Sequence, residues 1–98
     1  YSISLANRTP GDLQVVSRVV GKHCETGDIV VRDCELPADI RPGDLVAVAA
    51  TGAYCRSMAS NYNHIPRPAV VSVAGGVSQV LLRRESIADV LATDPGIN

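Results

Sequence analysis

One short segment of the sequence gathers most of the side chains that could take part in chemistry. Residues 21–28 carry an amine, an imidazole, a thiol, two carboxylates and two glycines, with Cys24 and Glu25 adjacent. A free thiol has a pKa of ~8.5 and is largely protonated at neutral pH. A neighbouring carboxylate favours the protonated form further, because like charges repel. The Cys24–Glu25 pair therefore favours a thiol that acts as a proton donor.

Two other interpretations of this segment stay open from the residues alone. His23 could instead favour a thiolate nucleophile at Cys24, although adjacent residues on an extended chain point to opposite faces. The segment could also be a solvated loop without chemistry, because free cysteine is commonly a small apolar residue. We favour the acid over the nucleophile and keep the solvated loop as the alternative.

A tyrosine follows the most apolar run of the sequence, residues 45–51. Gly52 lets the backbone turn sharply after that run, and Tyr54 then offers a hydroxyl that could hold a phosphate or a substrate oxygen. Alternatively, its ring fills a core in a chain that has no Phe or Trp. We interpret Cys34 and Cys55 as structural, and residues 83–85 as a solvated face.

Composition and spacing exclude several classes of protein. Nine basic and ten acidic residues give a net charge of −1, which argues against a nucleic-acid binder that depends on a basic surface. The apolar runs are far shorter than the ~20 residues of a membrane-spanning helix. The three cysteines form no C-x-x-C pair and the two histidines are far apart, so we predict no metal site and expect free thiols in a reducing cytoplasm.

Most of the chain is typical of β-strands, because residues branched at Cβ suit a pleated surface. Gly75-Gly76 predicts a tight hairpin, and Ser86 with Asp89 resembles a capping box at the start of a helix. The strands are expected at residues 13–20, 29–36, 45–51, 69–73 and 77–83, and short helices at 54–60 and 87–92. The fold class is therefore mainly β: an antiparallel, Greek-key β-barrel or sandwich with one or two short helices.

The length and the apolar fraction predict one small domain. Ninety-eight residues suffice for a single domain. An apolar fraction of 46% predicts a real core, and the absence of large rings means that it must be built from Val, Ala, Leu and Ile. The chain begins with Tyr1 and shows no signal peptide, which we interpret as a fragment or a processed chain.

Four blocks of the sequence occur in an order and spacing that resemble one enzyme family. The chain resembles the C-terminal part of diaminopimelate decarboxylases, within the fold-type III pyridoxal-phosphate decarboxylases, over nearly its whole length. The combination is specific because four ordered blocks seldom match by chance. The blocks are HCETGD at 23–28, TGAY at 51–54, SMASNYN at 57–63 and PRPA at 66–69.

The resemblance implies that residues 1–98 are a single C-terminal β-domain of a longer enzyme. The (β/α)₈ barrel that binds pyridoxal 5'-phosphate, with its Schiff-base lysine, would then lie outside this chain. Such enzymes convert meso-2,6-diaminopimelate to L-lysine and carbon dioxide, the last step of lysine biosynthesis, in the cytoplasm. They are homodimers with composite active sites at the subunit interface. The partners implied are thus the barrel domain, a second subunit and a small-molecule substrate.

The resemblance also implies roles for three residues. Cys24 corresponds to the proton donor, Glu25 to a substrate-binding carboxylate, and Tyr54 to a residue that touches both cofactor and substrate. We expect the domain alone to be inactive and marginally stable. The alternatives are a related ornithine, arginine or carboxypolyamine decarboxylase domain, or a non-enzymatic β-rich binding module; the Cys24–Glu25 pair favours diaminopimelate.

Overall fold

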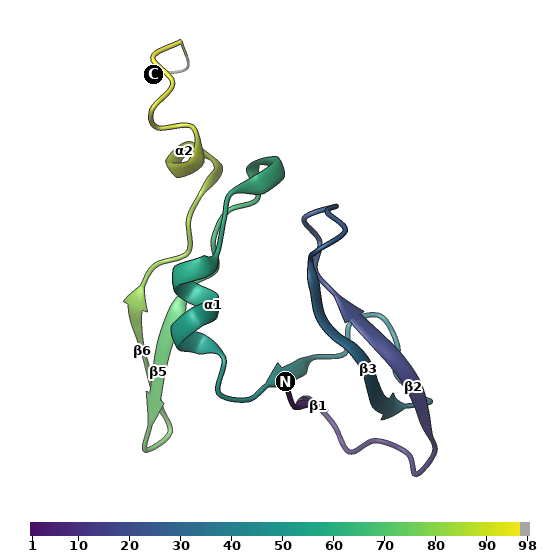
Figure 1. The fold of residues 1–98 in the computed structure, drawn as a ribbon. Helices are drawn as coiled ribbons and strands as arrows, with labels where there is room; N and C mark the ends of the chain where they lie inside the picture. Colours follow the sequence, from purple (N-terminus) through teal and green to yellow (C-terminus); the bar gives the residue numbers. More distant parts are fainter. Residues whose placement is uncertain (97–98) are drawn as a thin grey trace. The chain divides into compact units, whose positions relative to one another are not determined.

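The computed structural model describes residues 1–96, which belong to two compact units, Tyr1–Ser57 and Met58–Asn98. Figure 1 traces the chain through both units. Each unit is built from short antiparallel strand pairs and short helical segments.

The first unit contains two antiparallel strand pairs. Strand β1 (Ile3–Leu5) pairs with β4 (Val46–Val48), and β2 (Gln14–Val20) pairs with β3 (Ile29–Pro37). The β2–β3 hairpin is the longer ribbon in Figure 1, and its ladder is irregular around Val19, near the loop that joins the strands. Such irregularities bend a strand and increase its twist. The unit ends in helix α1 (Gly52–Met58).

The second unit contains a tight hairpin and a capped helix. Strand β5 (Val70–Ala74) pairs with β6 (Val77–Leu82), and both residues of the turn, Gly75 and Gly76, have positive φ angles of 58° and 75°. Two positive φ angles define the turn that matches the twist of a hairpin, and glycine adopts them without strain. The predicted hairpin is therefore confirmed. A 3-10 turn (Tyr62–His64) precedes it.

Helix α2 (Ile87–Val90) begins with the predicted capping box. The backbone N–H of Asp89 donates to the Ser86 hydroxyl at 3.1 Å, and the backbone N–H of Ser86 donates to the Asp89 carboxylate at 2.8 Å. These two bonds satisfy N–H groups that the first turn of a helix leaves without partners. Within residues 1–96, no helix has the length and apolar character needed to cross a membrane.

The predicted mainly β class with short helices is confirmed, and the strands form three separate two-stranded antiparallel sheets. One strand expectation is wrong. Residues 45–51 were expected to form a strand buried on both faces, yet only Val46–Val48 pair, and Leu45 and Val46 are 63% and 41% exposed. Ala50, with a φ of 55°, turns the chain before the run is complete. The short strand β1, which is its partner, was not expected.

The expected aliphatic core is also not formed by the described residues. Leu36, 5% exposed, and the adjacent Pro37 are the only residues among 1–96 that are buried as a whole. Valines on both longer hairpins, such as Val16 and Val73, are exposed. Two-stranded ribbons are marginal in water because they offer no second layer against which to bury a face. The hydrophobic effect within this chain therefore contributes little to its stability.

A polar clamp centred on Arg8 holds the first unit instead. Two guanidinium N–H groups donate to the carboxylate of Asp44 at 2.9 and 2.8 Å, and a third donates to Asp39 at 3.0 Å. The Arg8 hydrogen bonds hold the pKa of Asp44 and that of Asp39 below the ordinary value. The side chain of Asp44 is 4% exposed, so water screens this pair little. The clamp ties the segment after β1 to the turn before β4.

The exposed apolar surface leads to a first prediction, for residues 1–98 produced alone. We expect the isolated chain to bind a hydrophobic dye strongly and to lose its β signal gradually on heating, because almost no apolar side chain is buried. Circular dichroism and dye fluorescence measure both effects. A protein of similar size with a packed apolar core is the control. A sharp cooperative melt of an isolated monomer at high temperature would contradict this prediction.

The clamp leads to a second prediction, for Arg8→Ala in the intact protein. At neutral pH we expect faster hydrogen exchange at the amides of Ala6 and Ala49, whose bonds to Leu45 and Ser2 flank the β1–β4 ladder. The lowered pKa of a folded carboxylate adds stability above the pKa of an unfolded aspartate, about 3.9, and this is lost as the pH falls through the folded value. The difference between variants should therefore narrow below about pH 4.

The matched control for that experiment is Arg41→Ala, which removes an exposed guanidinium while keeping the backbone N–H that donates to Asp44 at 2.9 Å. Equal exchange in Arg8→Ala and wild type at neutral pH, or a difference that grows in acid, would show that the clamp does not stabilise this ladder.

Candidate active-site loop

The loop between β2 and β3 carries the predicted chemical residues, and backbone hydrogen bonds close it. The N–H of Gly21 donates to the carbonyl of Asp28 at 2.9 Å, where the two strands separate. Inside this closure, the N–H of Asp28 donates to the carbonyl of Glu25 at 3.1 Å and forms a tight turn. The loop is thus a compact structure at the end of the hairpin.

Cys24 lies in this loop with an unusual backbone conformation. Its φ angle is +57°, in the left-handed region, and its side chain is exposed. This conformation costs a residue with a Cβ on the order of 1 kcal/mol and persists only where surrounding contacts impose it. The left-handed turn takes Cys24 out of the alternation of a strand, and the thiol is accessible from outside the chain.

The imidazole of His23 pairs with Asp28. Its Nδ1 lies 3.0 Å from Asp28 Oδ2, and the backbone N–H of His23 donates to the same oxygen at 3.1 Å. Both side chains are less than a third exposed, at 29% and 28%. This pairing orients the ring towards a carboxylate, so the geometry gives no support to a Cys–His nucleophile at Cys24.

Glu25 and Tyr54 are both exposed and lie in different elements. The carboxylate of Glu25 accepts a hydrogen bond from the Thr26 hydroxyl at 3.3 Å, within the loop. Tyr54 lies in the first turn of α1, 73% exposed, and its hydroxyl has no hydrogen-bond partner within residues 1–96. The structure therefore brings Cys24 and Glu25 into one loop, and no hydrogen bond in the described part of the chain links Tyr54 to them.

The remaining cysteines differ from Cys24 in their surroundings. Cys34, on β3, is half-buried, and its thiol donates to the carbonyl of Ser17 at 3.5 Å. Cys55 is exposed on α1, and all three cysteines are free. No group of three or more His, Cys, Asp or Glu side chains among residues 1–96 could hold a metal ion.

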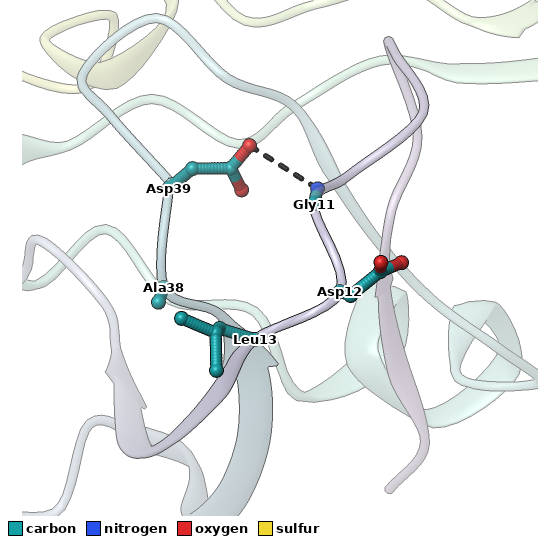
Figure 2. A pocket seen from close by; sticks show the side chains of 5 residues that line it. All are labelled: Gly11, Asp12, Leu13, Ala38 and Asp39. Atoms are coloured by element: carbon teal, nitrogen blue, oxygen red, sulfur yellow. Dashed lines mark hydrogen bonds between the residues drawn. The ribbon is translucent and has the colours of Figure 1, made fainter.

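A groove in the first unit lies beside the Arg8 clamp and is separate from the loop. Figure 2 shows its five lining residues, with the N–H of Gly11 donating to the carboxylate of Asp39 at 3.2 Å. Because Asp39 is already engaged by Arg8, the groove offers no free catalytic group at that position. Its lining residues are Gly11, Asp12, Leu13, Ala38 and Asp39.

The second unit contains a polar network that was not predicted. Glu85, expected on a solvated face, is half-buried and accepts the backbone N–H of Arg67 at 2.6 Å and the amide of Asn61 at 3.1 Å. The Arg67 guanidinium donates to Asn61 at 2.6 Å and lies 3.6 Å from Glu85. The expectation for Glu85 is therefore wrong, because its partners are far away in sequence. The prolines flanking Arg67 were the one available signal, since they hold that segment extended.

Arg83 is also paired, although it is exposed as expected. Its guanidinium donates to the carboxylate of Asp89 at 2.8 Å, and this bond lowers the pKa of Asp89. The same carboxylate closes the capping box of α2. Arg83 thereby reinforces the start of that helix.

Comparison with known sequences identifies the domain family to which this chain is similar. Residues 2–52 match the family model described as pyridoxal-dependent decarboxylase, C-terminal sheet domain. The chain is 55% identical over 94 residues to the diaminopimelate decarboxylase of Mycobacterium tuberculosis, and 44% identical over 94 residues to that of Bacillus subtilis. Both alignments cover 96% of this chain and 21% of the relative, so the chain spans about a fifth of the length of these proteins.

Solved structures agree with the sequence matches. The diaminopimelate decarboxylase of M. jannaschii in complex with L-lysine superposes with a TM-score of 0.84 at 33% identity, over 96% of this chain and 21% of that one. The Helicobacter pylori enzyme with L-lysine gives 0.84 at 31% identity, over 100% and 24%. The chain belongs to the C-terminal sheet domains of the pyridoxal-dependent decarboxylases.

Proposed function

We propose that this chain is the part of a pyridoxal-phosphate-dependent diaminopimelate decarboxylase that completes the active site of a barrel domain. The reaction proposed is the conversion of meso-2,6-diaminopimelate to L-lysine and carbon dioxide. The single observation that carries the proposal is the exposed Cys24–Glu25 pair on a closed loop, in a chain 55% identical to a diaminopimelate decarboxylase. We expect the chain to be inactive alone.

The proton donor in this proposal is Cys24. Loss of carbon dioxide leaves an electron pair on carbon, and that carbon must receive a proton before the product can leave. A free thiol is largely protonated at neutral pH and is a suitable general acid when held close to the carbon. The exposure of Cys24 and the left-handed backbone that displays it support delivery of the proton to a substrate bound by another part of the protein.

Glu25 would bind the end of the substrate that does not react. Diaminopimelate carries an ammonium group there, and a charge-assisted hydrogen bond from an ammonium to a carboxylate is stronger than one between neutral groups. Within residues 1–96 the only hydrogen bond that the Glu25 side chain accepts is the one from Thr26. It therefore retains acceptor capacity for a ligand.

The described residues fit pyridoxal 5'-phosphate at one position, Tyr54. Its exposed hydroxyl has no hydrogen-bond partner in the described chain, so it can donate to a phosphate or to a substrate oxygen. When bound, the cofactor would supply the conjugated ring that accepts the electron pair left on carbon as carbon dioxide departs. The only lysine of the sequence, Lys22, lies in the Cys24 loop, and we place the Schiff-base lysine outside these 98 residues.

The exposure of all three groups favours a composite site. Cys24, Glu25 and Tyr54 are all exposed on the described chain, so a substrate and cofactor bound by them would need other polypeptide to enclose them. We propose that the barrel domain of the parent enzyme and a second subunit of a cytoplasmic homodimer provide that enclosure. A related substrate such as ornithine or arginine remains the alternative that a substrate panel tests.

A third prediction concerns the three residues in the intact enzyme. We expect Cys24→Ala to lower kcat for carbon dioxide release by about 10²- to 10⁴-fold, the usual contribution of a general acid. Glu25→Gln should mainly raise KM for diaminopimelate, and Tyr54→Phe should raise the cofactor concentration needed for half-maximal activity. Steady-state kinetics with cofactor titration measure all three effects.

Cys55→Ala is the matched control, because it removes an exposed thiol from α1 without touching the loop. Full activity in both Cys24→Ala and Glu25→Gln would refute the assigned roles. Release of carbon dioxide from ornithine or arginine, and not from diaminopimelate, would show that the proposed substrate is wrong. The absence of carbon dioxide release from every amino acid would favour a binding module.

A further inference from the structure

We infer that Asp28 is a positioning residue that holds Cys24 in its left-handed conformation, a role that rests on the proposed function. Asp28 is not adjacent to Cys24 in sequence, and neither composition nor spacing indicated a task for it. The structure assigns one through four contacts that converge on this residue from both sides of the loop.

The carboxylate of Asp28 fastens the residue before the cysteine. One oxygen, Oδ2, accepts a hydrogen bond from the backbone N–H of His23 at 3.1 Å and lies 3.0 Å from the ring Nδ1 of the same residue. Two contacts to one residue fix both the direction of its backbone and the rotamer of its side chain. The N–H of His23 belongs to the planar peptide that joins Lys22 to His23, so this hydrogen bond fixes the orientation of the backbone that leads into Cys24.

The backbone of Asp28 forms hydrogen bonds with Gly21, which precedes the cysteine, and with Glu25, which follows it. Its carbonyl accepts the N–H of Gly21 at 2.9 Å, and its N–H donates to the carbonyl of Glu25 at 3.1 Å. Cys24 therefore lies between two residues, His23 and Glu25, that are each bonded to Asp28. The strained φ of +57° at Cys24 is the conformation that connects these two anchored points.

Gly21 leaves the space that the carboxylate occupies. A Cβ built on Gly21 would lie 2.0 Å from Asp28 Oδ2 and 2.3 Å from its Cγ, distances that no real contact allows. A side chain at position 21 would therefore displace the carboxylate from His23. Gly21, directly after β2, thus leaves the room that the close approach of Asp28 uses. This is a second observation in support of the Asp28 brace, the set of contacts that Asp28 makes to Gly21, His23 and Glu25.

The contacts of Asp28 matter for chemistry because proton transfer requires a precisely positioned thiol. A general acid must lie within hydrogen-bond reach of the atom that it protonates, and a displacement of 1 Å can cost about 10²-fold in rate. An unbraced Cys24 would relax from the left-handed region towards extended conformations and carry its thiol away. Binding of the substrate through Glu25 and other polypeptide would be affected less than the proton transfer.

The test compares Asp28→Ala with Asp28→Asn in the intact enzyme. Asp28→Ala removes the carboxylate oxygen that makes both contacts to His23, so we expect kcat to fall about 10- to 100-fold with KM changed less than about 2-fold. Asp28→Asn keeps one oxygen that can accept the same N–H groups, so it should recover most of kcat. His23→Ala keeps the backbone bond and should have an intermediate effect.

A second readout is independent of activity. Hydrogen exchange of peptides covering residues 21–28 should be faster in Asp28→Ala than in wild type and close to wild type in Asp28→Asn. The matched control is Asp33→Asn, which changes an exposed carboxylate on the same hairpin and should alter neither readout. If Asp28→Ala does not fold, Gly21→Ala is used, because its Cβ displaces the carboxylate while leaving Asp28 in place.

Each outcome decides the question. Unchanged exchange in Asp28→Ala overturns the brace, and faster exchange with unchanged kcat overturns its role in positioning Cys24. Faster exchange and reduced kcat in Asp28→Ala, with recovery in Asp28→Asn, support the inference. Full activity of Cys24→Ala would refute the proposed function instead, while the exchange measurement would still report whether Asp28 braces the loop.

Discussion

The small amount of apolar surface that this chain buries is the constraint on which the rest of its structure depends. Leu36 and Pro37 alone are buried among residues 1–96, although nearly half of the sequence is apolar. Without a core, each local conformation must be maintained by hydrogen bonds and ion pairs of short range. Such polar contacts typically contribute about 0.5–1.5 kcal/mol each, so the chain has little stability beyond what its strand pairs and clamps provide.

Three clusters of hydrogen bonds and ion pairs maintain the local conformation in different parts of the chain. The Arg8 clamp ties the segment after β1 to the turn before β4, and the Asp28 brace shapes the Cys24 loop. In the second unit, Glu85 binds Arg67 and Asn61. Each joins a charged group to backbone N–H groups or to an opposite charge, which is the strong class of hydrogen bond. The apolar faces of the hairpins remain exposed, which supports the proposal that other polypeptide covers them.

The parts of the fold that could be predicted are those determined by neighbouring residues. The Gly75-Gly76 turn and the Ser86–Asp89 capping box depend on two to four consecutive positions, and the structure has both. The Arg8–Asp44 pair joins residues 36 positions apart, and Glu85 meets Arg67 across 18 positions. No local pattern distinguishes such pairs from ordinary surface charges, which is why Arg8 was missed and Glu85 was misassigned.

The candidate site also combines features that could be predicted from the sequence with features that could not. The density of reactive side chains in residues 21–28 was enough to single out the loop, and the ordered blocks were enough to suggest the family. The left-handed backbone of Cys24 and the approach of Asp28 to Gly21 are three-dimensional features that the order of residues does not reveal. The wrong expectation of a buried core arose because apolar composition cannot indicate whether the covering layer lies in the same segment.

The most direct test of the central claim is a crystal structure of the intact protein with pyridoxal 5'-phosphate and L-lysine bound. We expect the sulfur of Cys24 to lie within about 3–4 Å of the ligand carbon from which carbon dioxide has been lost, the near-contact range that proton transfer requires. Glu25 should accept a hydrogen bond from the distant ammonium group of the ligand. A sulfur facing bulk solvent, or enclosed among apolar side chains away from the cofactor, would show that Cys24 is not the proton donor.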